Sequence, residues 1–124
     1  MPLAIQTAVK TGEMFWCEPD PKDTVGSEQE KDRIWVIVSE SSLHRGKCVV
    51  AVPLTTQLHM ACAHLIQIPA DEFKMIHGTT AVSCVALTDQ IRALDKTRFR
   101  KKAGVVSVRG LTAIRFGMKR LFDL

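Results

Sequence analysis

The stretch RIWVIVS, Arg33 to Ser39, is a run of branched and aromatic residues that opens with a single arginine. Residues of these types are enriched in β-strands, so the run predicts a core strand. The eight residues that end at this arginine, GSEQEKDR (Gly26 to Arg33), hold three acidic and two basic side chains and no apolar one. The chain therefore passes from a highly polar loop directly into a buried strand, with Arg33 at the junction.

Short strands are expected on both sides of this one. The apolar runs and their flanking turn residues predict strands at Glu13 to Glu18, Cys48 to Thr55, Ala63 to Ile68, Thr80 to Ile91 and Gly104 to Val108. Pro53 suggests an edge strand or a bulge, because proline has no N–H to donate to a neighbouring strand. Single helical turns are expected in SESSLHRG (Ser39 to Gly46) and in ADEFK (Ala70 to Lys74).

The last part of the chain has a different periodicity. Apolar residues recur at steps of three and four at Leu111, Ile114, Met118, Leu121 and Phe122, which predicts an amphipathic helix of about a dozen residues. Ser107 is the expected N-cap of this helix. Five or six short strands and one terminal helix favour a mainly β fold with α, a small β-barrel with a C-terminal helix.

Length and composition indicate one soluble domain. A chain of 124 residues with 46% hydrophobic and 24% charged residues fits one globular domain, residues 1–124. No window approaches the roughly eighteen apolar residues of a membrane-spanning helix, so no membrane partner is expected. Residues 1–11 lack the pattern of a signal peptide and are expected to form a loose tail.

The cysteines and histidines give only a weak metal signal. Cys17, Cys48, Cys62 and Cys84 show no C-x-x-C spacing, so we expect reduced core thiols in a cytoplasmic protein. HMACAH brings His59 and His64 close to Cys62, but zinc usually needs a fourth ligand and a more regular spacing. A satisfied histidine pair is the better interpretation, and we predict no metal and no cofactor.

Positive charge is concentrated in the C-terminal third of the chain. From Arg92 to Leu124 there are ten Lys/Arg and two Asp/Glu, whereas the preceding residues hold seven and eleven. The two parts carry +8 and −4, which sum to the net charge of +4. This distribution suggests either a polyanionic or acidic partner or a well-solvated helix face.

Polar residues at strand ends are the remaining candidates for a site. There is no G-x-S-x-G motif and no glycine-rich phosphate loop. Strand ends can meet at one rim of a barrel, and such residues here are Arg33, Thr55, Thr56, Asp89, Gln90 and Arg92. Arginine suits a phosphate because its planar fork donates two parallel hydrogen bonds. Trp16 and Trp35 can stack on bases, although their apolar surroundings favour the core.

Four stretches in a fixed order resemble the MazF/PemK (Kid-like) toxins of bacterial type II toxin–antitoxin systems. They are GE-x-FW, P-x-x-x-x-GSEQ-x-x-x-R, VVAVPLTTQ and TDQIRALDKTR, and the similarity runs from about Gly12 to Phe122. The resemblance implies an SH3-like, CcdB-like barrel with a C-terminal helix. It also implies a cytoplasmic homodimer that cleaves single-stranded mRNA at specific sequences without metal and is neutralised by a cognate antitoxin.

The resemblance also assigns roles to individual residues. It places the catalytic arginine on Arg33, the catalytic threonine on Thr55 and the glutamate of GSEQ on Glu28. RNA contacts fall on Ser27, Gln29, Thr56, Gln57, Asp89, Gln90 and Arg92. In the implied reaction the 2′-hydroxyl attacks the adjacent phosphate, which leaves a 2′,3′-cyclic phosphate and a 5′-hydroxyl end. Glu28 is the candidate base, and an arginine-assisted route is the alternative.

Two departures from the family pattern keep other functions open. Ile34 stands where the family usually has proline, and Leu87 stands where some members have an arginine. Arg92 is a possible substitute for that arginine. These departures motivate one alternative, a catalytically inactive barrel that only binds RNA; the other alternative, a CcdB-like toxin that poisons gyrase, rests on the shared fold. Only the endoribonuclease cuts RNA in the absence of metal.

Overall fold

The computed structural model describes residues 9–17, 33–40, 47–76 and 78–124. Within them the strands are β1 (Glu13–Cys17), β2 (Arg33–Ile37), β3 (Cys48–Thr55), β4 (Ile66–Ile68), β5 (Phe73–Met75), β6 (Cys84–Ala86), β7 (Arg92–Asp95) and β8 (Phe99–Val106). The helix α2 (Val108–Phe122) follows β8, and four 3-10 turns, η3 (Leu58–Met60), η4 (Ala70–Glu72), η5 (Thr88–Gln90) and η6 (Lys96–Arg98), join strands.

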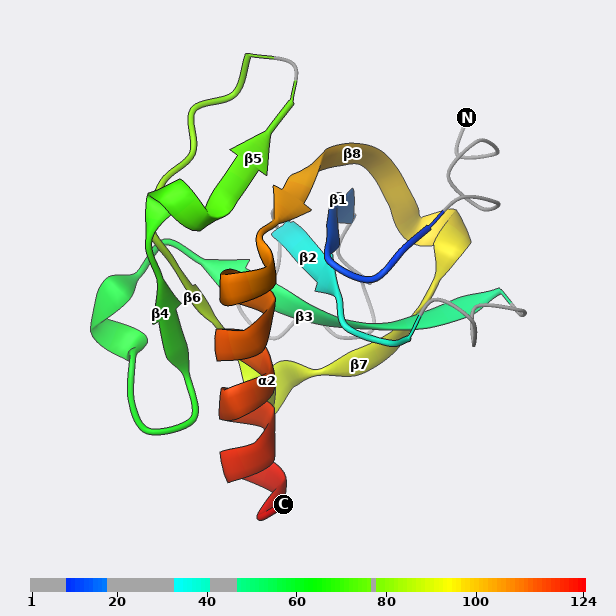
Figure 1. Cartoon of the computed structure of the whole chain (residues 1–124). Helices are drawn as coiled ribbons and strands as arrows, with labels where there is room; N and C mark the ends of the chain where they lie inside the picture. Colours follow the sequence, from blue (N-terminus) through cyan, green and yellow to red (C-terminus); the bar gives the residue numbers. More distant parts are fainter. Residues whose placement is uncertain (1–8, 18–32, 41–46, 77) are drawn as a thin grey trace, which may run out of the picture.

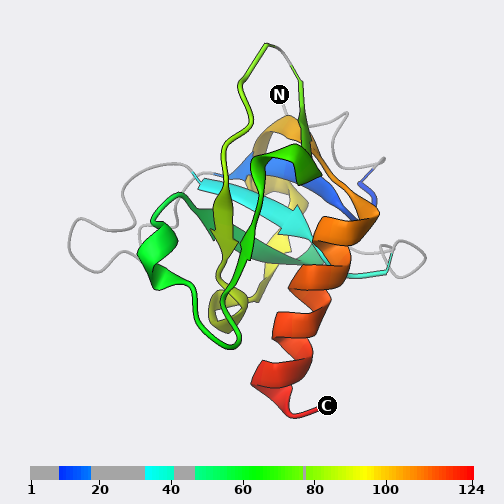
Figure 2. The same ribbon diagram turned by 60° about the vertical axis from the view of Figure 1, so that its left-hand side comes forward.

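The strands form one antiparallel sheet. The strand order is β4-β6-β3-β2-β1-β8-β5, and β7 also pairs with β3. Figure 1 shows this sheet curled into a partial barrel with α2 along one side, and Figure 2 shows β5 and its connection to β6 projecting at one end. The expectation of a small, mainly β barrel with a C-terminal helix is confirmed.

The central strands are buried on both faces, which explains their nearly continuous apolar sequence. In β1, Met14 belongs to a core cluster that also contains Ile114 of α2, whereas Phe15 belongs to a second cluster. Phe15 stacks on Phe99 of β8 with ring centroids 4.9 Å apart. Alternate side chains of a strand point to opposite faces, so β1 separates the two clusters. Of the loose tail expected at residues 1–11, the structure describes residues 9–11, where Val9 is buried in the second cluster and the Thr11 hydroxyl donates to the carbonyl of Ser39 at 2.6 Å; residues 1–8 lie outside the described residues.

The strand β3 is central, and its two halves have different partners on one edge. Its first half pairs with β7, with Cys48 opposite Asp95, and its last two residues pair with β6. Its other edge pairs with β2, where Pro53 lies opposite Trp35. The expectation of an edge strand at Pro53 is therefore wrong. This proline lies where β3 changes partner from β7 to β6, and its carbonyl accepts a hydrogen bond from the N–H of Leu87 at 2.9 Å.

The long strand expected from Thr80 to Ile91 is also wrong. Only Cys84–Ala86 is a strand, and the chain then turns through η5 before β7 begins at Arg92. The hydroxyl of Thr88 donates to the carbonyl oxygen of His64 at 2.6 Å, and Thr88 is fully buried. This tertiary contact fixes the turn inside what the sequence pattern presents as one apolar run.

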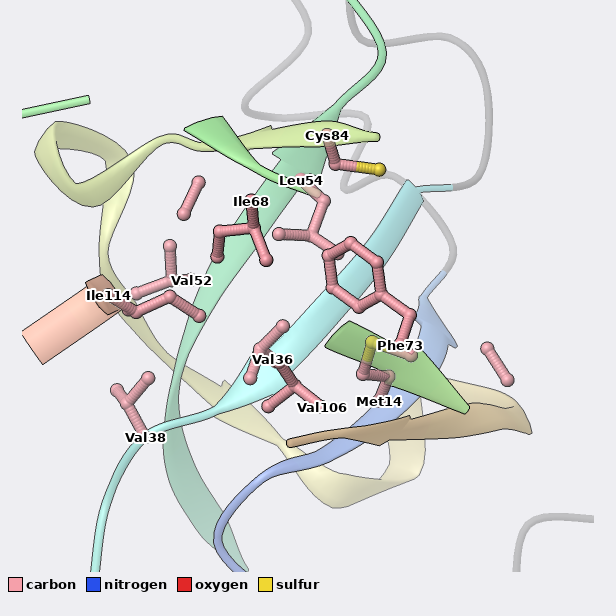
Figure 3. Packing of buried hydrophobic residues seen from close by; sticks show 12 residues of the cluster. Met14, Val36, Val38, Val52, Leu54, Ile68, Phe73, Cys84, Val106 and Ile114 are labelled. Carbon is pink, nitrogen blue, oxygen red and sulfur yellow. The ribbon is translucent and has the colours of Figure 1, made fainter. Parts of the chain in front are cut away.

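The helix α2 begins where its cap predicts. The Ser107 hydroxyl oxygen accepts a hydrogen bond from the N–H of Gly110 at 3.0 Å, which confirms it as the N-cap. Ile114 is fully buried, and Figure 3 shows it in the same cluster as Val52 and Ile68. A Cβ atom at Gly117 would lie 2.6 Å from the carbonyl oxygen of His64. The helix can therefore approach the segment before β4 closely only because glycine stands there.

Other boundaries differ from the expectations in smaller ways. The strand expected at Ala63 to Ile68 covers only Ile66–Ile68, and the short one at Gly104 to Val108 is the eight-residue β8. The strand β5 was not expected, although the brief helical turn before it is present as η4. Glu18 and the turn expected after Ser39 lie largely outside the described residues. No helix in the described ranges is long and apolar enough to span a membrane.

Candidate functional site

A cavity of about 370 Å³ lies beside the start of β2 and the end of β3. Arg33, the first residue of β2, lines it together with Thr55, the last residue of β3, and Thr56. These two strand ends come together because β2 and β3 are antiparallel neighbours. Of the strand-end residues expected to share one rim, the structure brings these three to one cavity.

The Arg33 guanidinium is the most unusual polar group at the cavity. Its Nη1 atom is buried and has no hydrogen-bond partner among the residues that the structure describes. A buried donor without an acceptor costs roughly 1–3 kcal/mol, so native proteins rarely retain one without a function. A planar cation with free donors is suited to an anion with two or more acceptor oxygens, such as a phosphate.

The two threonines add hydroxyl groups next to this cation. The Thr55 hydroxyl oxygen accepts a hydrogen bond from the N–H of Gln57 at 3.2 Å, and its own proton remains available for donation. Thr56 is exposed at the cavity. Thr55 is held in place by β6, because Thr55 lies opposite Val85 in that pairing. The site therefore combines the cation of Arg33 and the hydroxyl of Thr55, both on paired strand ends, with the exposed hydroxyl of Thr56 just after β3.

The other expected RNA-binding residues lie elsewhere or outside the described part. Asp89 and Gln90 are exposed on η5, which contacts both β3 and α2, and they do not line the cavity. Arg92 is half-buried at the start of β7, opposite Ala51. Gln57 is exposed and follows Thr56. Their contact with RNA stays a prediction, as it does for Ser27, Glu28 and Gln29, which fall outside the described residues.

Much of the cavity wall comes from residues that the sequence gave no reason to select. Phe73 and Met75 belong to β5, and Thr79 and Thr80 belong to its connection to β6. A three-residue strand is too short to show a periodic pattern, so no sequence signal identified this wall. Trp16, considered for stacking, is half-buried and does line the cavity. Trp35 packs instead against the second cluster, on the other face of the sheet.

Of the three candidate metal ligands in HMACAH, Cys62 and His64 are in contact. Cys62 Sγ lies 3.7 Å from Nδ1 of His64, and both belong to the connection between η3 and β4. His59 is exposed on η3. In the described ranges, no three His, Cys, Asp or Glu side chains are close enough to hold a metal ion.

None of the four cysteines forms a disulfide, and they lie in two different settings. Cys17 and Cys84 are buried as expected, whereas Cys48 and Cys62 are exposed, so the expectation of core thiols is wrong for these two. Burial raises the pKa of the Cys84 thiol, which lines the cavity. A raised pKa lowers the thiolate fraction at neutral pH, so Cys84 is a poor nucleophile.

We expect iodoacetamide at neutral pH to label Cys48 and Cys62 quickly in the native protein and Cys17 and Cys84 only after unfolding. The first two are exposed, and the second two are buried. Peptide mass spectrometry of samples quenched over time measures each site separately. If Cys84 is labelled as fast as Cys62, Cys84 is not buried at the cavity and its placement in the structure is wrong.

Residues 10–122 match the family model described as the PemK-like, MazF-like toxin of type II toxin–antitoxin systems. The chain belongs to this family. The match includes Arg33, Thr55 and Thr56, and the resemblance found in the sequence motifs is confirmed. No curated protein sequence matches the chain.

Solved structures with this toxin fold are similar over nearly the whole chain. An endoribonuclease in complex with its cognate antitoxin from a mycobacterial species has a TM-score of 0.67 and 20% identity, covering 94% of this chain and 97% of that one. MazF from Deinococcus radiodurans has a TM-score of 0.69 and 19% identity, covering 94% of this chain and 97% of that one. A MazE–MazF structure from the same organism has a TM-score of 0.65 and 17% identity, covering 94% and 96%. At these identities the likeness establishes the PemK/MazF fold.

Proposed function

We propose that this PemK/MazF-family toxin is an endoribonuclease that cleaves single-stranded mRNA at specific sequences without a metal ion. The observation that carries the proposal is the buried Nη1 of Arg33, which has no hydrogen-bond partner among the described residues and lies at a cavity shared with Thr55 and Thr56. A phosphodiester supplies the acceptor oxygens that this guanidinium lacks. Family membership supports the same reading, because these proteins are toxins, and similar structures include a mycobacterial endoribonuclease.

The proposed reaction uses a nucleophile that RNA itself carries. The 2′-hydroxyl of one nucleotide gives up its proton to a base and attacks the adjacent phosphorus, the bond from phosphorus to the 5′-oxygen breaks, and the 5′-oxygen takes up a proton, so that no proton is gained or lost overall. The products are a 2′,3′-cyclic phosphate and a 5′-hydroxyl end. The protein must hold the phosphate for in-line attack and stabilise the negative charge that develops on it.

These tasks fall to different residues. Arg33 stabilises the charge on the phosphate, where a preorganised cation has its largest effect because water is partly excluded. Thr55 donates a hydrogen bond to a phosphate oxygen and so fixes its orientation. Glu28 remains the proposed base, supported by the family motif alone. Asp89, Gln90 and Arg92 are proposed to bind flanking nucleotides from η5 and β7, outside the cavity.

The proposal extends to the partners of the protein. We propose that it acts as a homodimer in the cytoplasm and that a cognate antitoxin binds it and blocks RNA cleavage. Family membership in type II toxin–antitoxin systems supports an antitoxin partner. Solved MazE–MazF complexes of the same fold support a toxin surface that is available for such binding.

Incubation of the purified protein with a long single-stranded RNA in excess EDTA tests this function. We expect fragments that carry 5′-hydroxyl and 2′,3′-cyclic phosphate ends and share a short sequence at the cut. Direct ligation to the 5′-hydroxyl ends, followed by sequencing, identifies these ends and the sequence at the cut. RNA that stays intact with and without added Mg²⁺ would refute the proposal. Inhibition of gyrase under the same conditions would then support the CcdB-like alternative.

A further inference from the structure

The cavity at Arg33 is larger and more apolar than a phosphate requires. Most of the described residues that line it are apolar, among them Trp16 of β1, Ile34 of β2, Leu54 of β3 and Met75 of β5. A phosphate is fully charged and is not stabilised by such a wall. A volume of about 370 Å³ is at the small end of the range for pockets that bind small organic groups. The wall therefore fits an apolar or aromatic group attached to the phosphate.

The pairing of the strands shows how the apolar wall is built beside the arginine. Trp16 of β1 lies opposite Ile34 of β2, and both pack against the cluster that contains Met14. Met75 of β5 lies opposite Gly104 of β8, which in turn lies opposite Met14. The cavity is thus bounded by the faces of β1 and β2 on one side and by β5 on the other. Figure 3 shows Met14 and Phe73 of this wall.

Hydroxyl groups from a second direction complete the cavity. Thr79 and Thr80 lie on the connection from β5 to β6, are exposed, and line the cavity together with Val82. The preceding Gly78 has φ +73°, a left-handed conformation that glycine adopts without strain. Apolar faces combined with hydroxyl groups at the margin match a nucleobase, which has flat apolar faces and a polar hydrogen-bonding edge.

We propose that this cavity is a nucleobase subsite, and that Thr79 and Thr80 read the edge of the base next to the phosphate held by Arg33. The inference rests on the proposed endoribonuclease function and deepens it. The apolar wall takes the faces of the base, and the threonine hydroxyls donate to or accept from its edge. The connection between β5 and β6 then determines which base is accepted on one side of the cut.

The first test removes the hydroxyl groups and keeps the side-chain shape. In Thr79→Val, Thr80→Val and the double variant, we expect the preference for one base at one position beside the cut to fall roughly 3- to 10-fold, the contribution of one hydrogen bond. Sequencing of 5′-hydroxyl ends from a random-sequence RNA measures preference at every position at once. Preferences at the other positions should stay as in the wild type.

The second test fills the cavity with a larger side chain and, separately, removes one base from the RNA substrate. Val82, half-exposed at the cavity, is changed to Trp, and Val108, which is 83% exposed on α2 and does not line the cavity, is changed to Trp as the matched control. Substrates are short RNAs with a normal or an abasic nucleotide on either side of the cut. We expect Val82→Trp to lower kcat/KM on the normal RNA about as much as removal of one base does for the wild type. On that abasic RNA it should cause no further loss.

The outcomes separate this inference from the function on which it rests. If the wild type cuts RNA but the threonine variants keep every base preference, Thr79 and Thr80 do not read a base. If Val82→Trp lowers cleavage of normal and abasic RNA equally, the cavity holds no base. If the wild type cuts no RNA at all, the proposed function is wrong and the subsite is wrong with it.

Discussion

Replacement of Arg33 by alanine is expected to slow RNA cleavage by about 10²–10³-fold or more, the usual effect of losing one preorganised charge-stabilising donor. The same substitution should leave the free energy of unfolding unchanged or raise it by about 1 kcal/mol, because it removes a buried donor that has no acceptor among the described residues. Single-turnover cleavage and urea denaturation measure the two quantities on one preparation. Opposite responses of activity and stability are typical of a group retained for function.

Two further variants make this prediction specific. Arg115, exposed on α2, serves as a matched control, and its change to alanine should leave both quantities close to wild type. Arg33→Lys keeps the charge but loses the planar fork, so its cleavage rate should lie between those of wild type and Arg33→Ala. If Arg33→Ala lowers stability by several kcal/mol with a proportionate loss of active protein, the role of Arg33 is structural and the site assignment is wrong.

Replacement of Ile114 by alanine is expected to lower the free energy of unfolding by about 2–5 kcal/mol. Ile114 is fully buried and joins α2 to the core cluster shown in Figure 3. Truncation removes buried apolar surface and leaves a cavity that the surrounding strands cannot close. Because small domains are stable by only about 5–15 kcal/mol, this one change removes a large share of the total.

Phe116, on the same helix, provides the control for this prediction. It is 54% exposed, and its ring centroid lies 5.8 Å from the guanidinium carbon of Arg120. Phe116→Ala should therefore cost no more than about 1 kcal/mol, the scale of an exposed cation–π contact. Urea titrations followed by circular dichroism give both values. Equal losses for the two variants would mean that α2 is not held to the sheet through Ile114.

The sequence predicts those elements of the fold that have long periodic patterns or a local signal. The run Cys48 to Thr55 is a strand with the expected bounds, and the N-cap at Ser107 precedes α2 as expected. The break in the run from Thr80 to Ile91 could not be predicted. It depends on a hydrogen bond from Thr88 to the carbonyl of His64, twenty-four residues earlier in the chain. Tertiary contacts of this kind leave no periodic signal.

The same distinction applies to the candidate site. Arg33, Thr55 and Thr56 could be selected because they stand at the ends of recognisable strands and in family motifs. The opposite wall could not, because β5 has only three residues and Thr79 and Thr80 lie in an irregular connection. What identifies these residues is that they line the same cavity as Arg33. That position is set by the pairing of β5 with β8, not by the composition of their own segment.

The two walls of the cavity also differ in the free energy needed to displace them. The strand β3, which carries Thr55, is hydrogen-bonded along both edges, so displacing it requires the sheet to open as a whole. The strand β5 ends the strand order and pairs only with β8 among the described strands. Segments with fewer partners open locally at a lower free energy than the global transition. The β5 wall of the proposed base subsite is therefore the one expected to open locally, whereas the strand ends that carry Arg33 and Thr55 are expected to stay in register.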